Sequence, residues 1–189
     1  GRWPGKTALD FRREGDRVRF VMPGEFPEMT LYVWVRIDAL DRHLNSLFLT
    51  ESFDENEVHW QVARTGHLHF ATSPMGWDDL DDHARRFFSD NFWTPQQSGQ
   101  WQFIGTTIDT ASGEVKHYLN GDEIAIVDGD NRDKPLFPLQ IGEADLGNWT
   151  DDIRAKHFRT LNGRIDEFGI YRAALSADEM RELYEGGKY

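Results

Sequence analysis

Alternation between apolar and polar side chains over residues 29–37 is the feature that most restricts what this chain can fold into. The apolar side chains take every second position, at Met29, Leu31, Val33, Val35 and Ile37. Tyr32, Trp34 and Arg36 occupy positions between them. Because successive side chains of a β-strand point to opposite faces, this pattern predicts a strand with one face in a core and the other turned away from it.

Shorter runs with the same character recur along the chain and are separated by turn-forming residues. They cover residues 18–22, 46–50, 58–63, 68–71, 101–109, 115–119, 123–127, 138–141 and 164–171. Asn120-Gly121 lies between two of these runs, and this dipeptide is typical of a tight hairpin turn. The number and spacing of the runs predict an all-β sandwich of two antiparallel sheets.

The C-terminal residues have the pattern of a helix. Ser176 and Glu179 have the spacing of a capping box. Apolar residues then follow at helical spacing, at Met180, Leu183 and Tyr184. We therefore expect one short terminal helix packed across a sheet.

Two stretches, residues 73–100 and 128–160, interrupt the regular strand spacing and are rich in Asp. Long connections in a compact domain are commonly functional. We interpret both as loops, with one or two helical turns within residues 79–89.

Length and charge limit the classes of partner. The 189 residues fit a single domain over residues 1–189, and 21 basic against 33 acidic residues give a net charge of -12. This charge repels a phosphate backbone, so we expect no nucleic-acid partner.

The longest apolar stretch, residues 31–37, is too short to insert into a membrane. The absence of Cys excludes thiolate metal sites and cysteine nucleophiles.

Several segments, in order, carry a resemblance to a known family. Residues 8–11 and 16–18 are similar to its first hairpin, residues 29–36 and 99–109 to two of its strands, and residues 118–121 to a hairpin turn. Residues 161–180, LNGRIDEFGIYRAALSADEM, follow its closing strand and helix most closely. The chain thus resembles the LamG-like jelly-roll family of the concanavalin A-like lectin/glucanase superfamily. The resemblance implies a two-sheet antiparallel jelly roll with a short C-terminal helix.

The resemblance also sets the range of functions, because this fold carries lectins, pentraxins, glycosidases and adhesion modules. It implies a non-catalytic carbohydrate-binding or adhesion module in an extracytoplasmic protein, as one part of a longer chain. Its partner is then a glycan or polysaccharide, or another protein. A protein-interaction or spacer domain without a small ligand is the alternative.

A glycosidase is the third hypothesis. Retaining glycosidases of the superfamily place carboxylates alternately on one strand, at the separation that their chemistry needs. Glu51, Glu55 and Glu57 do not form the Glu-x-Asp-x-x-Glu pattern, and most of them fall in a predicted turn. We therefore expect no enzymatic activity.

Strand parity predicts which side chains meet a ligand. If Leu31 and Ile104 point into the core, a set of aromatic and polar side chains points outward, and this set could form one concave surface suited to a sugar ring. The predicted ligand-binding residues are Tyr32, Trp34, Arg36, His59, Trp101 and Tyr118. The alternative is a second apolar layer, covered by residues 73–100 or by the terminal helix.

Calcium is the one candidate cofactor, since relatives hold this ion near the first and last strands. Asp166 stands at the matching position of the closing strand, with Asp10 and Asp16 as candidate partners. Arg12 stands where the family often has Asp, which argues that the site is lost. His67 and His69 alternate on one strand, but no third metal ligand has matching spacing, so they are interpreted as surface or ligand-facing polar groups.

Overall fold

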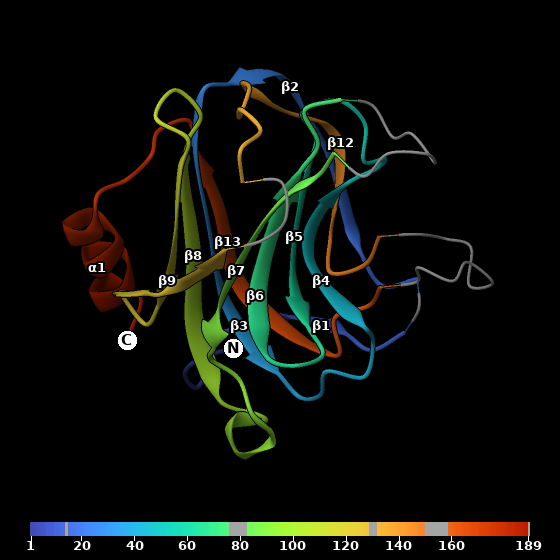
Figure 1. Cartoon of the computed structure of the whole chain (residues 1–189). Helices are drawn as coiled ribbons and strands as arrows, with labels where there is room; N and C mark the ends of the chain where they lie inside the picture. Colours follow the sequence, from blue (N-terminus) through green and yellow to red (C-terminus); the bar gives the residue numbers. More distant parts are fainter. Residues whose placement is uncertain (14, 76–82, 129–131, 150–158, 189) are drawn as a thin grey trace.

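Two antiparallel sheets stack face to face in this computed structural model, and one helix lies on the outer side of one sheet (Figure 1). The structure describes residues 1–13, 15–75, 83–128, 132–149 and 159–188. The prediction of an all-β sandwich with a C-terminal helix is confirmed.

The strand orders define the two sheets. Sheet A has the order β1-β13-β3-β8-β9-β10, and sheet B has the order β11-β7-β6-β5-β4-β12-β2. The strands of sheet A are β1 (Leu9–Phe11), β13 (Gly163–Tyr171), β3 (Glu28–Ile37), β8 (Trp101–Asp109), β9 (Glu114–Leu119) and β10 (Asp122–Ile124). Those of sheet B are β11 (Ile126–Asp128), β7 (Arg85–Asn91), β6 (His67–Thr72), β5 (Val58–Ala63), β4 (Leu44–Thr50), β12 (Leu139–Leu146) and β2 (Val18–Phe26).

The inner faces of the sheets form the main core, as strand parity predicts. Sheet A contributes the alternate residues Leu31, Val33, Val35, Ile104 and Ile108, and sheet B contributes Val58, Trp60, Val62, Leu68 and Phe70. All of them are buried, so period-2 patterning alone sorted these strands correctly. The hairpin turn is also confirmed: Asn120 (φ 51°) and Gly121 (φ 83°) join β9 to β10 with the positive φ angles of such a turn.

Three local expectations are wrong. Residues 85–91 of the expected loop form strand β7, and the rest of the expected helical stretch lies largely outside the described residues. The single strand expected over residues 123–127 is divided: β10 pairs with β9 in sheet A, and β11 pairs with β7 in sheet B. The chain therefore changes sheets at Ala125. A one-residue break is enough to redirect a strand, and it leaves the hydrophobic pattern nearly unchanged.

The first expected hairpin does not form either. β1 pairs with the closing strand β13, in the register Leu9↔Ile165, while β2 pairs with β12 in the other sheet. Alternation gives the facing of a strand but not its neighbour, so the two segments resemble one hairpin although they belong to different sheets.

Helix α1 (Ala177–Gly186) covers the outer face of sheet A (Figure 1). Its N-terminus has the predicted capping box, in which the Ser176 amide donates to the Glu179 carboxylate at 2.7 Å. Met180 fills the space above Gly105, where any Cβ would lie 2.2 Å from the Met180 methyl. In the described part of the chain no helix has the length and apolar character needed to cross a membrane.

A chain of buried hydrogen bonds joins the two sheets through the core. The Trp60 indole N–H of sheet B donates to the Thr106 hydroxyl of sheet A at 2.8 Å. Thr106 in turn contacts His117 Nδ1 at 2.8 Å, and His117 Nε2 lies 3.1 Å from the Phe87 carbonyl of sheet B. One arrangement of protons satisfies every group: Thr106 donates to Nδ1, and the Nε2 proton donates to the carbonyl. Burial lowers the pKa of His117 to about 4, so the ring is neutral at neutral pH.

Thr106→Val should lower the free energy of unfolding by about 2 to 4 kcal/mol, because it leaves the Trp60 and His117 groups buried without a partner. Thr106→Ser keeps the hydroxyl and serves as the matched control, with a smaller loss from the missing methyl group. Urea denaturation of the three proteins measures the difference. Equal losses for Val and Ser would show that the hydroxyl contributes nothing.

Candidate functional site

The predicted aromatic surface exists, but it is filled. Trp34 and Tyr118 lie on the outer face of sheet A with only 5% and 1% of their surface exposed. With Phe103 and Met180 they form a second apolar cluster, and Tyr32, Trp101 and Tyr184 pack against it. Trp34 stacks on Tyr184 of α1 with ring centroids 5.5 Å apart. Of the two interpretations of these residues, the structure shows the second: they form an apolar layer that the terminal helix covers.

The two remaining predicted ligand residues lie on different sheets. Arg36 is on the same outer face of sheet A, in register with Trp101 near the end of β3, and its Nε donates to Asp38 at 3.0 Å. His59 is on β5 of sheet B, whose outer face points away from that of sheet A. The six residues therefore do not form one surface: parity identified outward side chains but not the sheet to which they belong.

The three predicted calcium ligands are held by other partners. The side chain of Asp166 has no exposed surface; the Arg2 amide donates to one carboxylate oxygen at 2.7 Å, and the cationic groups of Lys6 and Arg2 are paired to the other. Asp10 pairs with Arg12 and Arg164 at 3.1 and 2.9 Å.

Asp16 caps a turn by accepting from the amides of Arg12 and Arg13 at 2.9 and 2.8 Å. In the described ranges of the chain, no group of three or more acidic or His side chains has the geometry of a metal site. These residues do not fit a calcium ion, because positive side chains already neutralise Asp166 and Asp10.

A different group of side chains gathers on the outer face of sheet B. We define the outer-face site by six residues: His59 and Gln61 of β5, His69 of β6, Phe53 of the β4–β5 connection, and Trp149 and Arg159 from the connection between β12 and β13. His59, Gln61 and His69 are 3%, 1% and 4% exposed, whereas Phe53, Trp149 and Arg159 are partly exposed above them.

Arg159 organises the polar floor of this site. Its Nη1 lies 3.1 Å from His59 Nδ1 and donates to Gln61 Oε1 at 2.9 Å. Because a guanidinium only donates, His59 Nδ1 must accept, and the proton on Nε2 donates to the Ser52 carbonyl at 3.1 Å. Gln61 Nε2 then donates to His69 Nδ1 at 2.9 Å. The His69 proton is thereby fixed on Nε2, which is buried without a partner in the described structure.

The charge states agree with this order of donors. Burial, together with the positive charge of Arg159, lowers the pKa of His59 well below its usual range. Burial also lowers the pKa of His69 to about 3, with Arg86 and Arg159 adding to the effect. Arg159 itself has its pKa lowered by burial to about 10 and stays charged at neutral pH. The floor is a neutral set of donors and acceptors beneath one cation.

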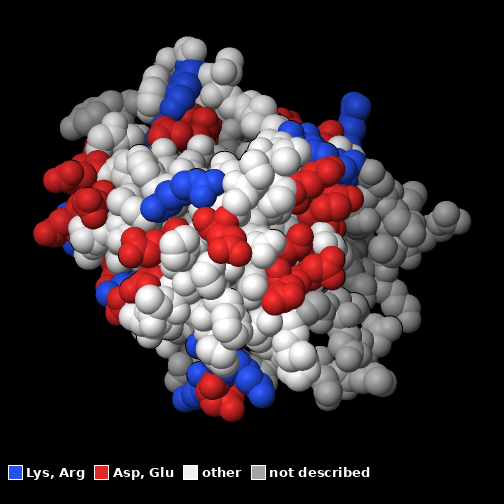
Figure 2. All heavy atoms as spheres, turned by 90° about the horizontal axis from the view of Figure 1, so that it is seen from above, with Lys and Arg blue, Asp and Glu red and all other residues white. Residues whose placement is uncertain are grey.

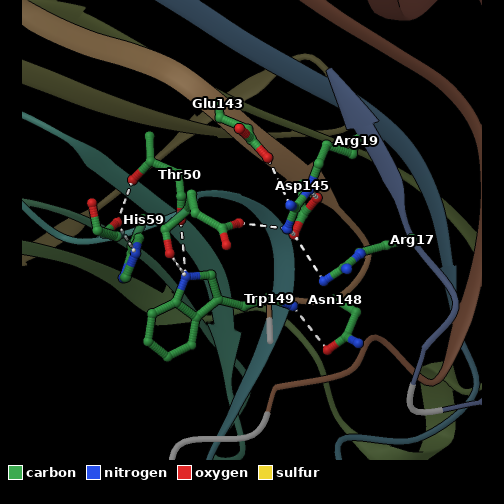
Figure 3. A network of polar contacts seen from close by, with 10 residues as sticks. Arg17, Arg19, Thr50, His59, Glu143, Asp145, Asn148 and Trp149 are labelled. Atoms are coloured by element: carbon green, nitrogen blue, oxygen red, sulfur yellow. Dashed lines mark hydrogen bonds and ion pairs between the residues drawn. The ribbon is translucent and has the colours of Figure 1, made fainter. Parts of the chain in front are cut away.

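Aromatic rings and an ion-pair network complete the site (Figure 3). His59 packs between Phe53 and Trp149, at centroid distances of 4.4 and 5.2 Å, and Arg159 lies over the Trp149 ring at 4.7 Å. The Trp149 indole N–H donates to the carbonyls of Thr50 and Glu51 at 2.9 and 3.1 Å, which fixes the ring (Figure 3).

Beside this ring, Arg19 of β2 donates to three carboxylates on two neighbouring segments: Glu51, which follows β4, and Glu143 and Asp145 of β12 (Figure 3). Arg17 also reaches Asp145, at 3.3 Å. The Asp145 carboxylate is fully buried, so both guanidiniums serve to neutralise it. This network joins β2, β4 and β12 next to the outer-face site and holds the backbone from which Trp149 projects.

A family model described as the concanavalin A-like lectin/glucanases superfamily matches residues 19–181. The chain belongs to this superfamily. No curated protein sequence matches the chain.

Solved structures place the chain among concanavalin A-like folds at low sequence identity. A SAP-like pentraxin from Limulus polyphemus is 13% identical with a TM-score of 0.60, and the match covers 96% of this chain and 77% of the pentraxin. A putative carbohydrate-binding protein from Bacteroides ovatus is 15% identical with a TM-score of 0.65, over 93% of this chain and 46% of that protein. The Ruminococcus gnavus IT-sialidase CBM40, bound to α2,3-sialyllactose, is 15% identical with a TM-score of 0.60, over 83% and 82% of the two chains.

The superfamily includes glucanases, so the carboxylates near the site matter. Glu57 accepts from the Ser52 hydroxyl at 2.8 Å and from the Asp54 amide at 3.0 Å, which ties it into a turn. Glu51 pairs with Arg19, and Glu55 lies exposed in the same turn as Glu57. These three residues hold a loop and an ion-pair network, and they do not form a pair facing one ligand.

Sequence reasoning found part of the outer-face site. Strand parity predicts the outward direction of His59, and His69 is interpreted as a surface or ligand-facing polar group. Arg159, Trp149 and Phe53 were missed as site residues, because they belong to connections without periodicity. The only signal for them in the sequence is the position of Trp149 just after a strand. That position does not show which sheet the ring lies against.

The free energy of unfolding should fall as the pH is lowered below about 6.5. His69 is neutral in the folded protein and its pKa is about 3, so the unfolded chain takes up the proton first. This contribution is fully present above the unfolded pKa and is lost at up to about 1.4 kcal/mol per pH unit for each such His. Urea denaturation between about pH 7.5 and 5 measures it, and His69→Gln should flatten the slope. An unchanged slope in that variant would contradict the assignment.

Calcium should leave the thermal stability unchanged. Because Lys6 and Arg2 already neutralise Asp166, we expect midpoints within about 1 °C of each other in excess EDTA and in millimolar calcium chloride. Differential scanning calorimetry measures this, with magnesium chloride as the control for ionic strength. A saturable increase specific to calcium would show that the ion is bound.

Proposed function

We propose that this domain is a non-catalytic carbohydrate-binding module whose ligand meets the outer-face site on sheet B. One observation carries the proposal: the outer face of sheet A is filled by the apolar side of α1, whereas that of sheet B carries fixed polar groups beneath partly exposed aromatic rings. A sugar offers both apolar ring faces and hydroxyls, so it needs this combination.

The division of roles follows from the geometry. Trp149 and Phe53 offer aromatic surface, and the indole hydrogen bonds hold Trp149 in place before any ligand arrives. Arg159 is positioned by His59 and Gln61, so its remaining N–H groups are oriented toward a ligand hydroxyl or ring oxygen. Such preorganisation reduces the entropy that binding costs.

Surface charge narrows the class of glycan. Asp and Glu side chains are spread over much of the face seen in Figure 2, in keeping with the net charge of -12. Chains with many anionic groups, nucleic acids included, are disfavoured by this field. A neutral glycan is the ligand that best suits the outer-face site.

The solved structures support the type of function and its setting. Two of the similar proteins are described as carbohydrate-binding, and the Bacteroides protein is more than twice as long as the part that this chain matches. We propose that the domain works outside the cytoplasm, as one module of a longer protein.

A glycan array and calorimetric titration with the best-bound neutral glycan test the proposal. Trp149→Ala should weaken binding about tenfold or more, as expected for the loss of an aromatic anchor. Arg159→Gln should weaken it as well, by removing the charged donor. Trp3→Ala is the matched control, because Trp3 is 37% exposed and lies in the N-terminal segment away from sheet B.

Near-ultraviolet circular dichroism checks that each variant is folded. If wild-type protein binds no neutral glycan, or if the folded Trp149 variant binds as well as the wild type, the proposed site is wrong. Release of reducing sugar from polysaccharides by the wild-type protein would contradict the non-catalytic role.

A further inference from the structure

A hollow of about 520 Å³ lies at one end of the sandwich, away from the outer-face site. It lies where the β3–β4 connection, the β5–β6 turn and the segment after β7 meet, next to the short 3-10 helix η1 (Pro95–Gln97) at the lower end of Figure 1. Its polar lining includes Asp38, Arg64, Asn91, Trp93, Thr94 and Ser98. None of these residues takes part in the contacts of the outer-face site.

Trp93 lines this hollow and carries an unsatisfied donor. The residue is 93% buried, and in the described structure its indole nitrogen is fully buried without a hydrogen-bond partner. An indole N–H only donates, and buried donors almost always have an acceptor in a folded protein. An oxygen atom of a ligand in the hollow would supply that acceptor.

Local charge in the hollow favours an anion although the whole chain is acidic. Arg12 and Arg36 pair with the Asp38 carboxylate at 2.6 and 3.0 Å and neutralise it. Arg64 also lines the hollow, and among the described residues no side chain or carbonyl oxygen pairs with its guanidinium. Because Asp38 is already paired, the guanidinium of Arg64 leaves positive charge in the lining. A guanidinium binds a carboxylate through two parallel N–H groups.

The walls of the hollow are held in place by hydrogen bonds. The Gly66 carbonyl accepts from the amides of Phe92 and Trp93 at 3.0 and 3.3 Å, which ties the β5–β6 turn to the segment that carries Trp93. The Ser98 hydroxyl donates to the Asp38 carbonyl at 2.6 Å. The backbone segments that carry Arg64 and Trp93 are therefore hydrogen-bonded to each other, as a preformed site requires.

We propose that this hollow is a second binding site, for a sugar that carries a single carboxylate. Arg64 binds the carboxylate, the Trp93 N–H donates to an oxygen of the ring or a hydroxyl, and the Asn91 carbonyl oxygen and Thr94 hydroxyl accept from the remaining hydroxyls. The site is independent of the outer-face site, so either one can fail without the other.

Titration with D-glucuronate, followed by the side-chain ¹H–¹⁵N signals of the Trp residues, tests the proposal. Trp93→Phe assigns the signal of Trp93 and removes the donor while keeping an aromatic ring. We expect D-glucuronate to move the Trp93 signal in a saturable way at millimolar to tens of millimolar concentration. Arg64→Gln should weaken this response about tenfold, as expected for the loss of a charge-assisted contact.

Matched variants and ligands distinguish binding in this hollow from a general effect of charge or of added sugar. Arg181→Gln removes an exposed Arg of α1 and should leave the titration unchanged, as should Trp149→Ala at the outer-face site. D-glucose has the sugar hydroxyls without the carboxylate, and acetate has the carboxylate without the sugar. Each should bind more weakly than D-glucuronate. An unmoved Trp93 signal, a normal response in folded Arg64→Gln protein, or equal binding of acetate would each overturn the proposal.

Discussion

Each sheet buries one face in a shared core. The outer face of each sheet then either packs against another part of the chain or contacts solvent and ligands. On sheet A the remaining face carries Trp34, Phe103 and Tyr118, which are too apolar to stay in water, and α1 covers them. On sheet B the remaining face carries His59, Gln61 and His69. Buried polar groups need partners, and Arg159 supplies one to His59 and one to Gln61, which in turn donates to His69. The outer face of sheet A is therefore part of the protein's own packing, whereas the outer face of sheet B is the candidate binding face.

His59, His69 and His117 are buried in this domain as neutral rings. His117 connects the sheets through Thr106, and His59 and His69 accept hydrogen bonds in the outer-face site. In each case burial lowers the pKa, so the ring supplies one donor and one acceptor without a charge. The buried carboxylates of Asp145 and Asp166 are instead paired with Arg or Lys side chains.

Local pattern predicted those parts of the fold that depend on local physics. The alternation in β3 and β8, the Asn120-Gly121 turn and the Ser176–Glu179 capping box are all present as expected. Strand β7, the division between β10 and β11 and the pairing of β1 with β13 were missed, since each depends on which distant strand lies alongside. For the same reason only His59 and His69 of the outer-face site were expected from the sequence.

The sequence by itself determined the facing of the main strands, the terminal helix and the superfamily, because side-chain period and capping act within a few residues of each other. Only the tertiary structure decided that Trp34 is covered, that Lys6 and Arg2 neutralise Asp166, and that Arg159 reaches His59. These contacts join residues about a hundred or more positions apart, and they form because burial forces each polar or apolar group to find a partner in space.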